Sequence, residues 1–270
     1  MSPVAAAKKP FLSVTTGPKN ARTDPDSGLR FYTWQGKEYP SVTSIRNLAG
    51  MPHKLANWRT NQVIEKAMTE YPTLGTMLTT STPEVTASWL RRAMNERRDK
   101  AADLGKRVHD AAEKRMPLAK APADLSPFLL HYYEWMEKSK VEILLAERQV
   151  WSPSVGYAGT FDMIGRFPGG DWLIDLKTGS GTYPEHAMQL EAYARADFVG
   201  EDDIEDAAAT AILRGITGRA ILHLTPTGWS FSVVPASQET WFAFRGLLQF
   251  ANWAHVHPDI TSLTGKVVSG

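Results

Sequence analysis

Two β-rich runs joined by a short turn constrain the fold of this chain most. Residues 157–167 and 172–177 are bounded by turn residues, and Pro168-Gly169-Gly170-Asp171 between them is short enough for an antiparallel hairpin. Further strands are predicted at residues 141–151, 219–225 and 229–234. Because helical patterns precede, interrupt and follow these strands, we expect an α/β fold with a sheet flanked by helices.

Helical patterns dominate the part of the chain before the sheet. The predicted helices span residues 54–69, 83–116, 128–137, 184–198 and 238–253. A hairpin is expected over residues 30–39 around Gln35-Gly36, and either Ser41 or Thr43 is expected to begin the next helix as its N-cap. The expected organisation is a flexible lead-in (1–28), a hairpin and helical region covering the site (29–140), and an α/β core (141–270) onto which a helix near 97–116 packs.

The 270 residues contain no cysteine. This composition excludes disulfide scaffolds, cysteine proteases, zinc sites with cysteine ligands and iron–sulfur clusters held by thiolates. A net charge of +1 excludes a histone-like polycation but allows a local basic groove. The sequence shows neither a secretory signal nor an apolar run long enough to cross a membrane, so we expect a cytoplasmic protein without a membrane partner.

The strongest local signal is the run Asp175-Leu176-Lys177-Thr178-Gly179 at the end of a predicted strand. Side chains alternate along a strand, so Asp175 and Lys177 share one face. Taken alone, the pair is most simply a surface ion pair worth about 0–1 kcal/mol. If Phe167 pairs near Trp172, however, Asp162 lies opposite Lys177 and within reach of Asp175. Two carboxylates and a lysine at one strand end predict a site for a hard cation of the Mg²⁺ type.

Two pairs of residues with helical spacing complete the set. Gly105 and His109 are four residues apart and share a helix face, as do Gln189 and Tyr193. A glycine inside a helix costs about 1 kcal/mol relative to alanine, which indicates that something approaches the backbone at Gly105. Either pair alone is more often a structural feature than a site, so the order of the motifs carries the argument.

That order, GxxxH, GTxD, DLKTG and QxxxY, resembles the RecB-like branch of the PD-(D/E)XK nuclease superfamily. The resemblance covers about residues 100–200, and the run 39–45 with Trp58 is also similar to phage exonucleases and mitochondrial genome maintenance exonucleases. CRISPR-associated relatives hold an iron–sulfur cluster with four cysteines, which this chain lacks. The resemblance implies a restriction-endonuclease-like core, with a mixed central sheet flanked by helices and an N-terminal helical elaboration.

The resemblance also implies a role for each residue of the motifs. His109, Asp162 and Asp175 would hold Mg²⁺ or Mn²⁺, and Asp175 stands where many members have glutamate. Lys177 would orient the attacking water or stabilise charge on the phosphate. Gln189 and Tyr193 would border the site as supporting catalytic residues, where they would either touch the nucleic acid or orient the lysine. Glu147 matches a frequent acid of the family and is equally well an ordinary strand glutamate.

DNA is the partner that this resemblance implies. The basic residues expected to steer it are Arg91, Arg92, Arg97, Arg98, Lys106 and Arg107, although the same residues also fit a solvated helix face. We therefore expect a metal-dependent DNA exonuclease of recombination, repair or phage DNA processing, in a bacterial cytoplasm if phage-encoded, working with a single-strand annealing or binding protein. The alternatives are a structure-specific or restriction-like endonuclease and a non-catalytic DNA-binding subunit with the same fold.

Overall fold

The computed structural model describes residues 20–25, 27–49 and 53–257, and the side chains of residues 53–56, 58–59 and 95–98 lie outside its described part. Its centre is a mixed seven-stranded sheet with the strand order β10-β9-β6-β5-β4-β7-β8. The strands are β4 (Glu142–Ser152), β5 (Tyr157–Phe167), β6 (Gly170–Lys177), β7 (Phe198–Glu201), β8 (Ile204–Glu205), β9 (Gly218–Thr225) and β10 (Gly228–Val233). β6 and β9 pair in parallel, and the other neighbours are antiparallel. The predicted α/β sheet flanked by helices is confirmed.

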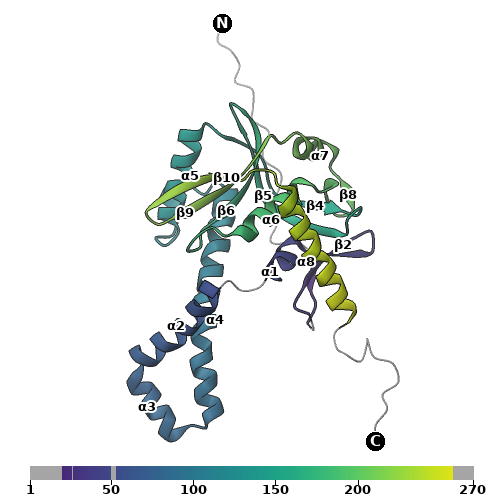
Figure 1. Ribbon diagram of the computed structural model, residues 1–270. Helices are drawn as coiled ribbons and strands as arrows, with labels where there is room; N and C mark the ends of the chain where they lie inside the picture. Colours follow the sequence, from purple (N-terminus) through teal and green to yellow (C-terminus); the bar gives the residue numbers. More distant parts are fainter. Residues whose placement is uncertain (1–19, 26, 50–52, 258–270) are drawn as a thin grey trace, which may run out of the picture.

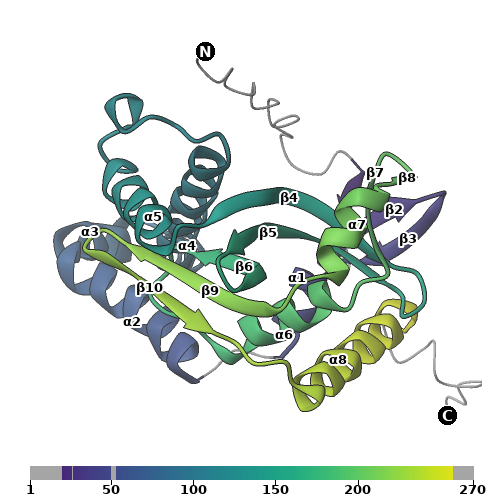
Figure 2. The same cartoon turned by 90° about the horizontal axis from the view of Figure 1, so that it is seen from above.

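Helices cover both faces of this sheet (Figure 2). On one face, α5 (Ser126–Ser139) and the second half of α4 (Pro83–Glu113) pack against apolar side chains of β6 and β9. On the other face lie α1 (Val42–Asn47), α6 (Pro184–Ala194) and α8 (Gln238–Val256). The alternation of Leu173 and Ile174 between these two apolar clusters reflects the two-residue repeat of a strand that is buried on both sides.

The N-terminal hairpin forms as expected and belongs to a second, three-stranded sheet. Its strands are β1 (Ala21–Thr23), β2 (Arg30–Trp34) and β3 (Lys37–Pro40). Gln35 and Gly36 both have positive φ, as a two-residue turn of the primed type requires. Ser41 is the N-cap of α1, where its side chain accepts from the amide of Ser44. Of the expected lead-in, residues 1–19 lie outside the described residues, and β1 is ordered by pairing with β2, a contact with no local signal.

An arm extends from the body of the protein (Figure 1). It consists of α2 (His53–Thr69), α3 (Tyr71–Thr80) and the first half of α4; α2 packs mainly against α4, and α3 contacts both of them. α4 is a single helix of 31 residues that runs from this arm to the sheet. The short 3₁₀ helix η1 (Leu118–Lys120) then leads to α5.

Two details of the sequence prediction are wrong. The helix expected over 184–198 ends at Ala194, because Phe198 and Val199 pair with β4 and start β7 instead. The helix α7 (Ala207–Arg214) follows, with Asp206 as its N-cap. In the central hairpin Phe167 pairs with Gly170 rather than near Trp172. The turn is therefore shorter than expected, and the register of the two strands differs by two residues. A shift of two leaves every side chain on its expected face.

Among the described residues, no helix is both long and apolar enough to cross a membrane.

Candidate metal centre at the open end of the central hairpin

Three neighbouring strands each carry one acidic residue at the same level of the sheet. The pairing of β4 with β5 on either side of them places Glu147 opposite Asp162. The pairing of β5 with β6 continues the row to Asp175, one step beyond the last ladder pair. Asp162 thus faces Asp175 rather than Lys177. The carboxylates of three adjacent strands therefore lie in one row.

His109 reaches this row from α4. Its Nδ1 atom lies 3.5 Å from Glu147 Oε1 and 3.8 Å from Asp162 Oδ1. These three residues each offer a ligand atom within 4.8 Å of the others, the spacing of a cation site. On the other side of the ring, Nε2 lies 3.0 Å from the carbonyl oxygen of Leu176. A proton on Nε2 satisfies that carbonyl, which leaves the Nδ1 lone pair directed at the acids.

The electrostatics of His109 depend on its two acidic neighbours. Burial lowers the pKa of the imidazole, but the charges of Asp162 and Glu147 outweigh it and raise the pKa to about 9. The positive charge of Lys177 lowers the pKa of His109. In the protein without a cation, a proton on Nδ1 therefore balances the acids at neutral pH.

Asp162 is fixed by the backbone of the adjacent strand. Its Oδ2 atom accepts a hydrogen bond of 2.6 Å from the amide of Leu176, at the point where the β5–β6 ladder has ended. Its Oδ1 atom remains on the side of His109. One carboxylate oxygen is thus committed to structure and the other is available to a ligand.

Asp175 and Lys177 form a pair inside the site. Lys177 Nζ donates to Asp175 Oδ1 over 2.5 Å, and Asp175 is only 2% exposed. Burial raises the pKa of Asp175, and Lys177 opposes that rise. The second oxygen, Oδ2, is buried and has no hydrogen-bond partner in the part of the chain that the structure describes. A buried carboxylate oxygen without a partner is costly, so this atom is a natural ligand for a cation or an ordered water.

Glu147 has an unusual backbone for a strand residue. Its φ of +48° lies in the left-handed region, although residues on both sides of it pair with β5. Such a conformation costs a non-glycine residue about 1–3 kcal/mol, and strained residues of this kind cluster at functional sites. The sequence left Glu147 undecided between an ordinary strand residue and a ligand. Its position beside His109 and Asp162 favours the ligand.

Gln189 and Tyr193 support the site from α6. Gln189 Nε2 lies 3.2 Å from the Tyr193 hydroxyl, and both side chains are buried. Burial raises the pKa of Tyr193 above its usual range. The Tyr193 ring occupies the space above Gly159, where a Cβ atom would lie 2.6 Å from it. The glycine of the GTxD motif therefore makes room for the tyrosine of the QxxxY motif.

The close approach predicted at Gly105 is confirmed. A Cβ atom on Gly105 would lie 3.0 Å from Thr178 Oγ1, directly after the lysine strand. This contact sets α4 against the end of β6, one helical turn before His109.

The basic residues of α4 lie at different distances from the row of acids. Arg91 and Arg92 are exposed on the arm, and Lys106 is exposed close to His109 in the chain. Arg107 forms a two-pronged ion pair with Asp124, at 2.7 and 3.2 Å, which engages its guanidinium within the protein. The side chains of Arg97, Arg98 and Trp58 lie outside the described residues.

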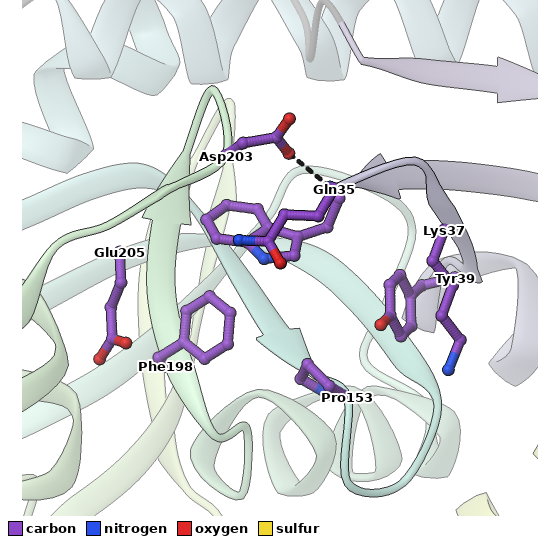
Figure 3. A pocket seen from close by; sticks show the side chains of 8 residues that line it. Gln35, Lys37, Tyr39, Pro153, Phe198, Asp203 and Glu205 are labelled. Atoms are coloured by element: carbon purple, nitrogen blue, oxygen red, sulfur yellow. Dashed lines mark hydrogen bonds between the residues drawn. The ribbon is translucent and has the colours of Figure 1, made fainter.

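A separate hollow of about 490 Å³ lies between the β2–β3 hairpin and the acidic segment 197–206 (Figure 3). Asp203 accepts a hydrogen bond from the backbone amide of Gln35 at its edge, 2.7 Å long. The lining residues are Trp34, Gln35, Lys37, Tyr39, Pro153, Phe198, Asp203 and Glu205. None of the predicted site residues is among them, so the hollow is distinct from the candidate metal centre.

Comparison with known proteins adds little to this geometry. No family model matches the chain, and no curated protein matches it. Among solved structures it is similar to one described as "Crystal structure of SSO0001", at 16% sequence identity and a TM-score of 0.30. That alignment covers 57% of this chain and 74% of the other. A likeness of this degree carries no argument, and the site is interpreted from its own residues.

Proposed function

We propose that this protein is a metal-dependent DNA exonuclease of the RecB-like PD-(D/E)XK type, which hydrolyses phosphodiester bonds. One observation carries the proposal: His109, Glu147 and Asp162 converge beside the Asp175–Lys177 pair, at one level of three adjacent strands. Carboxylates from neighbouring strands can hold a divalent cation, and an adjacent lysine can stabilise negative charge on a phosphate. The order of the four sequence motifs agrees with this interpretation.

The residues present fit Mg²⁺ or Mn²⁺. Hard divalent cations prefer carboxylate oxygens, and an imidazole nitrogen is acceptable to Mn²⁺. Glu147, Asp162 and His109 would hold the ion, with the buried Oδ2 of Asp175 as a further oxygen. A bound ion supplies a water of lowered pKa and neutralises negative charge on the phosphate.

The protein's own groups would perform the remaining tasks. The ammonium of Lys177, held by Asp175, is a fixed donor for charge that develops on the phosphate oxygens. The Leu176 backbone orients Asp162 and His109 through its amide and its carbonyl. Because these supports are main-chain groups of the sheet, the site is preorganised before substrate arrives.

The choice of DNA rests on α4. Arg91, Arg92 and Lys106 are exposed along a single helix that runs from the arm to His109, and this helix offers positive charge for a phosphate backbone. We expect digestion to begin at strand ends.

The test is digestion of matched linear and circular DNA, single- and double-stranded, with Mg²⁺ or Mn²⁺. Asp162→Asn and Lys177→Met should each lower the rate by at least about 100-fold, and chelator should abolish it. Asp202→Asn, an exposed acid on the β7–β8 turn, serves as the matched control and should keep full activity.

Each outcome of this experiment supports one of the three functions. Digestion of linear DNA alone supports the exonuclease. Cleavage of circles would replace it with an endonuclease. DNA binding without cleavage by either metal would leave a non-catalytic DNA-binding subunit.

A further inference from the structure

A cation next to the candidate metal centre has no counter-charge. Arg46 lies in the last turn of α1, and its Nε and Nη1 atoms are buried without a hydrogen-bond partner. In the described part of the chain no carboxylate lies within ion-pair distance of its guanidinium. A guanidinium keeps its charge at any pH a protein tolerates, and buried donors of a charged group are costly without a partner. Arg46 as a whole is half-buried, but these two donors are shielded from water and would be satisfied by an anion.

The surroundings of Arg46 connect it to the site. α1 packs against α6, and α6 packs against β6. His186, in the first turn of α6, is buried and accepts a hydrogen bond from the Tyr183 amide through Nδ1, over 3.2 Å. Besides burial, the nearby charges of Lys177 and Arg46 both lower the pKa of His186, to about 4. Arg46 and Lys177 thus lie on the same side of the sheet, with a neutral imidazole among them.

Other groups around His186 add positive rather than negative potential. His223 on β9 pairs in register with Lys177, and its Nε2 donates to the Gly179 carbonyl over 2.7 Å. His186 also lies in the first turn of α6, where the helix dipole is positive. Asp175 is the carboxylate that acts on His186, and it is paired with Lys177. Glu185, in the first turn of α6, is half-buried. The chemistry that fits this surplus of donors is a phosphate group.

We propose that Arg46 binds a phosphate of the substrate strand next to the phosphodiester that is cleaved. The inference rests on the proposed function, because it takes the strand to be DNA. The link between the two sites is His186, on which the charges of Arg46, Lys177 and Asp175 all act. The bound phosphate supplies the counter-charge that Arg46 lacks, and it positions the strand across Lys177. The group is either a terminal phosphate or an internal one.

The experiment measures binding without cleavage. Fluorescence anisotropy in EDTA would compare labelled single-stranded oligonucleotides with a 5′-phosphate, a 3′-phosphate or neither, and one with a neutral methylphosphonate at successive internal positions. The proteins are the wild type, Arg46→Met, Arg46→Lys and Arg245→Met, an exposed arginine of α8 used as the control. Circular dichroism establishes that each variant is folded, and Arg46→Gln replaces Arg46→Met if the latter is not.

Arg46→Met should weaken binding about 10-fold or more, and the slope of log K against log salt should fall by about 0.7, the value for one lost contact on a single strand. Arg46→Lys should retain most of the affinity, and Arg245→Met all of it. Loss of the preference for one phosphorylated end identifies a terminal phosphate, whereas loss of sensitivity to one methylphosphonate identifies an internal phosphate.

Equal affinity of wild type and Arg46→Met for every oligonucleotide, or no binding by either, overturns the inference. Failure of the proposed function looks different: the wild type would discriminate phosphates through Arg46 in EDTA yet cut no DNA with either metal.

Discussion

The amide nitrogen of Leu176 donates a 2.6 Å hydrogen bond to the carboxylate of Asp162, where the ladder between β5 and β6 has ended. The carbonyl oxygen of the same residue lies 3.0 Å from His109 Nε2. The backbone of one strand residue, which pairs with β9 but has no ladder partner on the β5 side, thus orients two of the candidate ligands. Opening the hairpin by one pair creates the site and at the same time satisfies the peptide group that the opening exposes.

His109 should stabilise the metal-free protein in a pH-dependent way. Its pKa is about 9 in the folded protein, because Asp162 and Glu147 overcome the effect of burial, and 6.5 is its ordinary value. A raised pKa contributes stability that is fully present below pH 6.5 and is lost as the pH rises through 9. His109→Gln should therefore cost about 3 kcal/mol at pH 6 and much less at pH 10.

Urea denaturation of both proteins in EDTA at the two pH values measures this difference. The same comparison in an Asp162→Asn background should show a smaller pH dependence, because the leading cause of the raised pKa is then absent. A cost that does not change with pH would contradict the charge balance described for His109.

Divalent cations should stabilise the protein. At a concentration 100 times its Kd, an ion that binds only the folded state adds about 2.7 kcal/mol, or about 5 °C in Tm for a chain of this size. The apparent affinity should rise with pH, since His109 must lose its proton to bind the ion. Thermal melts with Mg²⁺ and Mn²⁺ test this expectation. An equal shift in Asp162→Asn would indicate that the ions bind elsewhere.

At position 147 we expect the glycine variant to be more stable than the alanine variant, which is the reverse of the usual order in a strand. In an ordinary strand glycine is about 0.5–1 kcal/mol less stable than alanine. At the positive φ of Glu147 alanine carries the strain and glycine does not, so Glu147→Gly should be about 1 kcal/mol more stable than Glu147→Ala. Both variants lose the carboxylate, so both should lose activity.

Chemical denaturation of the two variants measures the difference in the free energy of unfolding. Ser232 on β10 provides the reference pair, Ser232→Gly and Ser232→Ala, for an exposed strand residue. If glycine is the less stable residue at both positions, Glu147 carries no strain.

Gly159→Ala should destabilise the protein by about 1–3 kcal/mol, because the new methyl group overlaps the buried ring of Tyr193. The displaced ring would also disturb the Gln189 contact. Gly169→Ala, in the turn of the same hairpin, meets open space among the described residues and should change stability by less than about 0.5 kcal/mol. Equal effects of the two substitutions in urea denaturation would remove the steric explanation of the GTxD glycine.

Several parts of the fold were predictable because their causes are local. Gln35-Gly36 can turn with positive φ, Ser41 can cap a helix, and Gly105 inside a helix indicates a close neighbour; all three are borne out. The alternation of Asp175 and Lys177 likewise follows from the two-residue repeat of a strand and does not depend on the rest of the protein.

Other parts depend on contacts between distant residues, which local patterns do not contain. The register of Phe167 with Gly170 follows from packing of both strands as well as from the turn. Phe198 joins a strand because β4 offers an open edge, although its own neighbourhood has a helical pattern. Glu147 looks like any strand glutamate until the ladder sets it beside Asp162 and α4 brings His109 to both. The amino-acid sequence thus determined the turns, the helix caps and the face of each strand residue, because these depend on local backbone conformation. Strand pairing and helix packing decided which polar side chains come into contact, because they join residues that are far apart in the sequence.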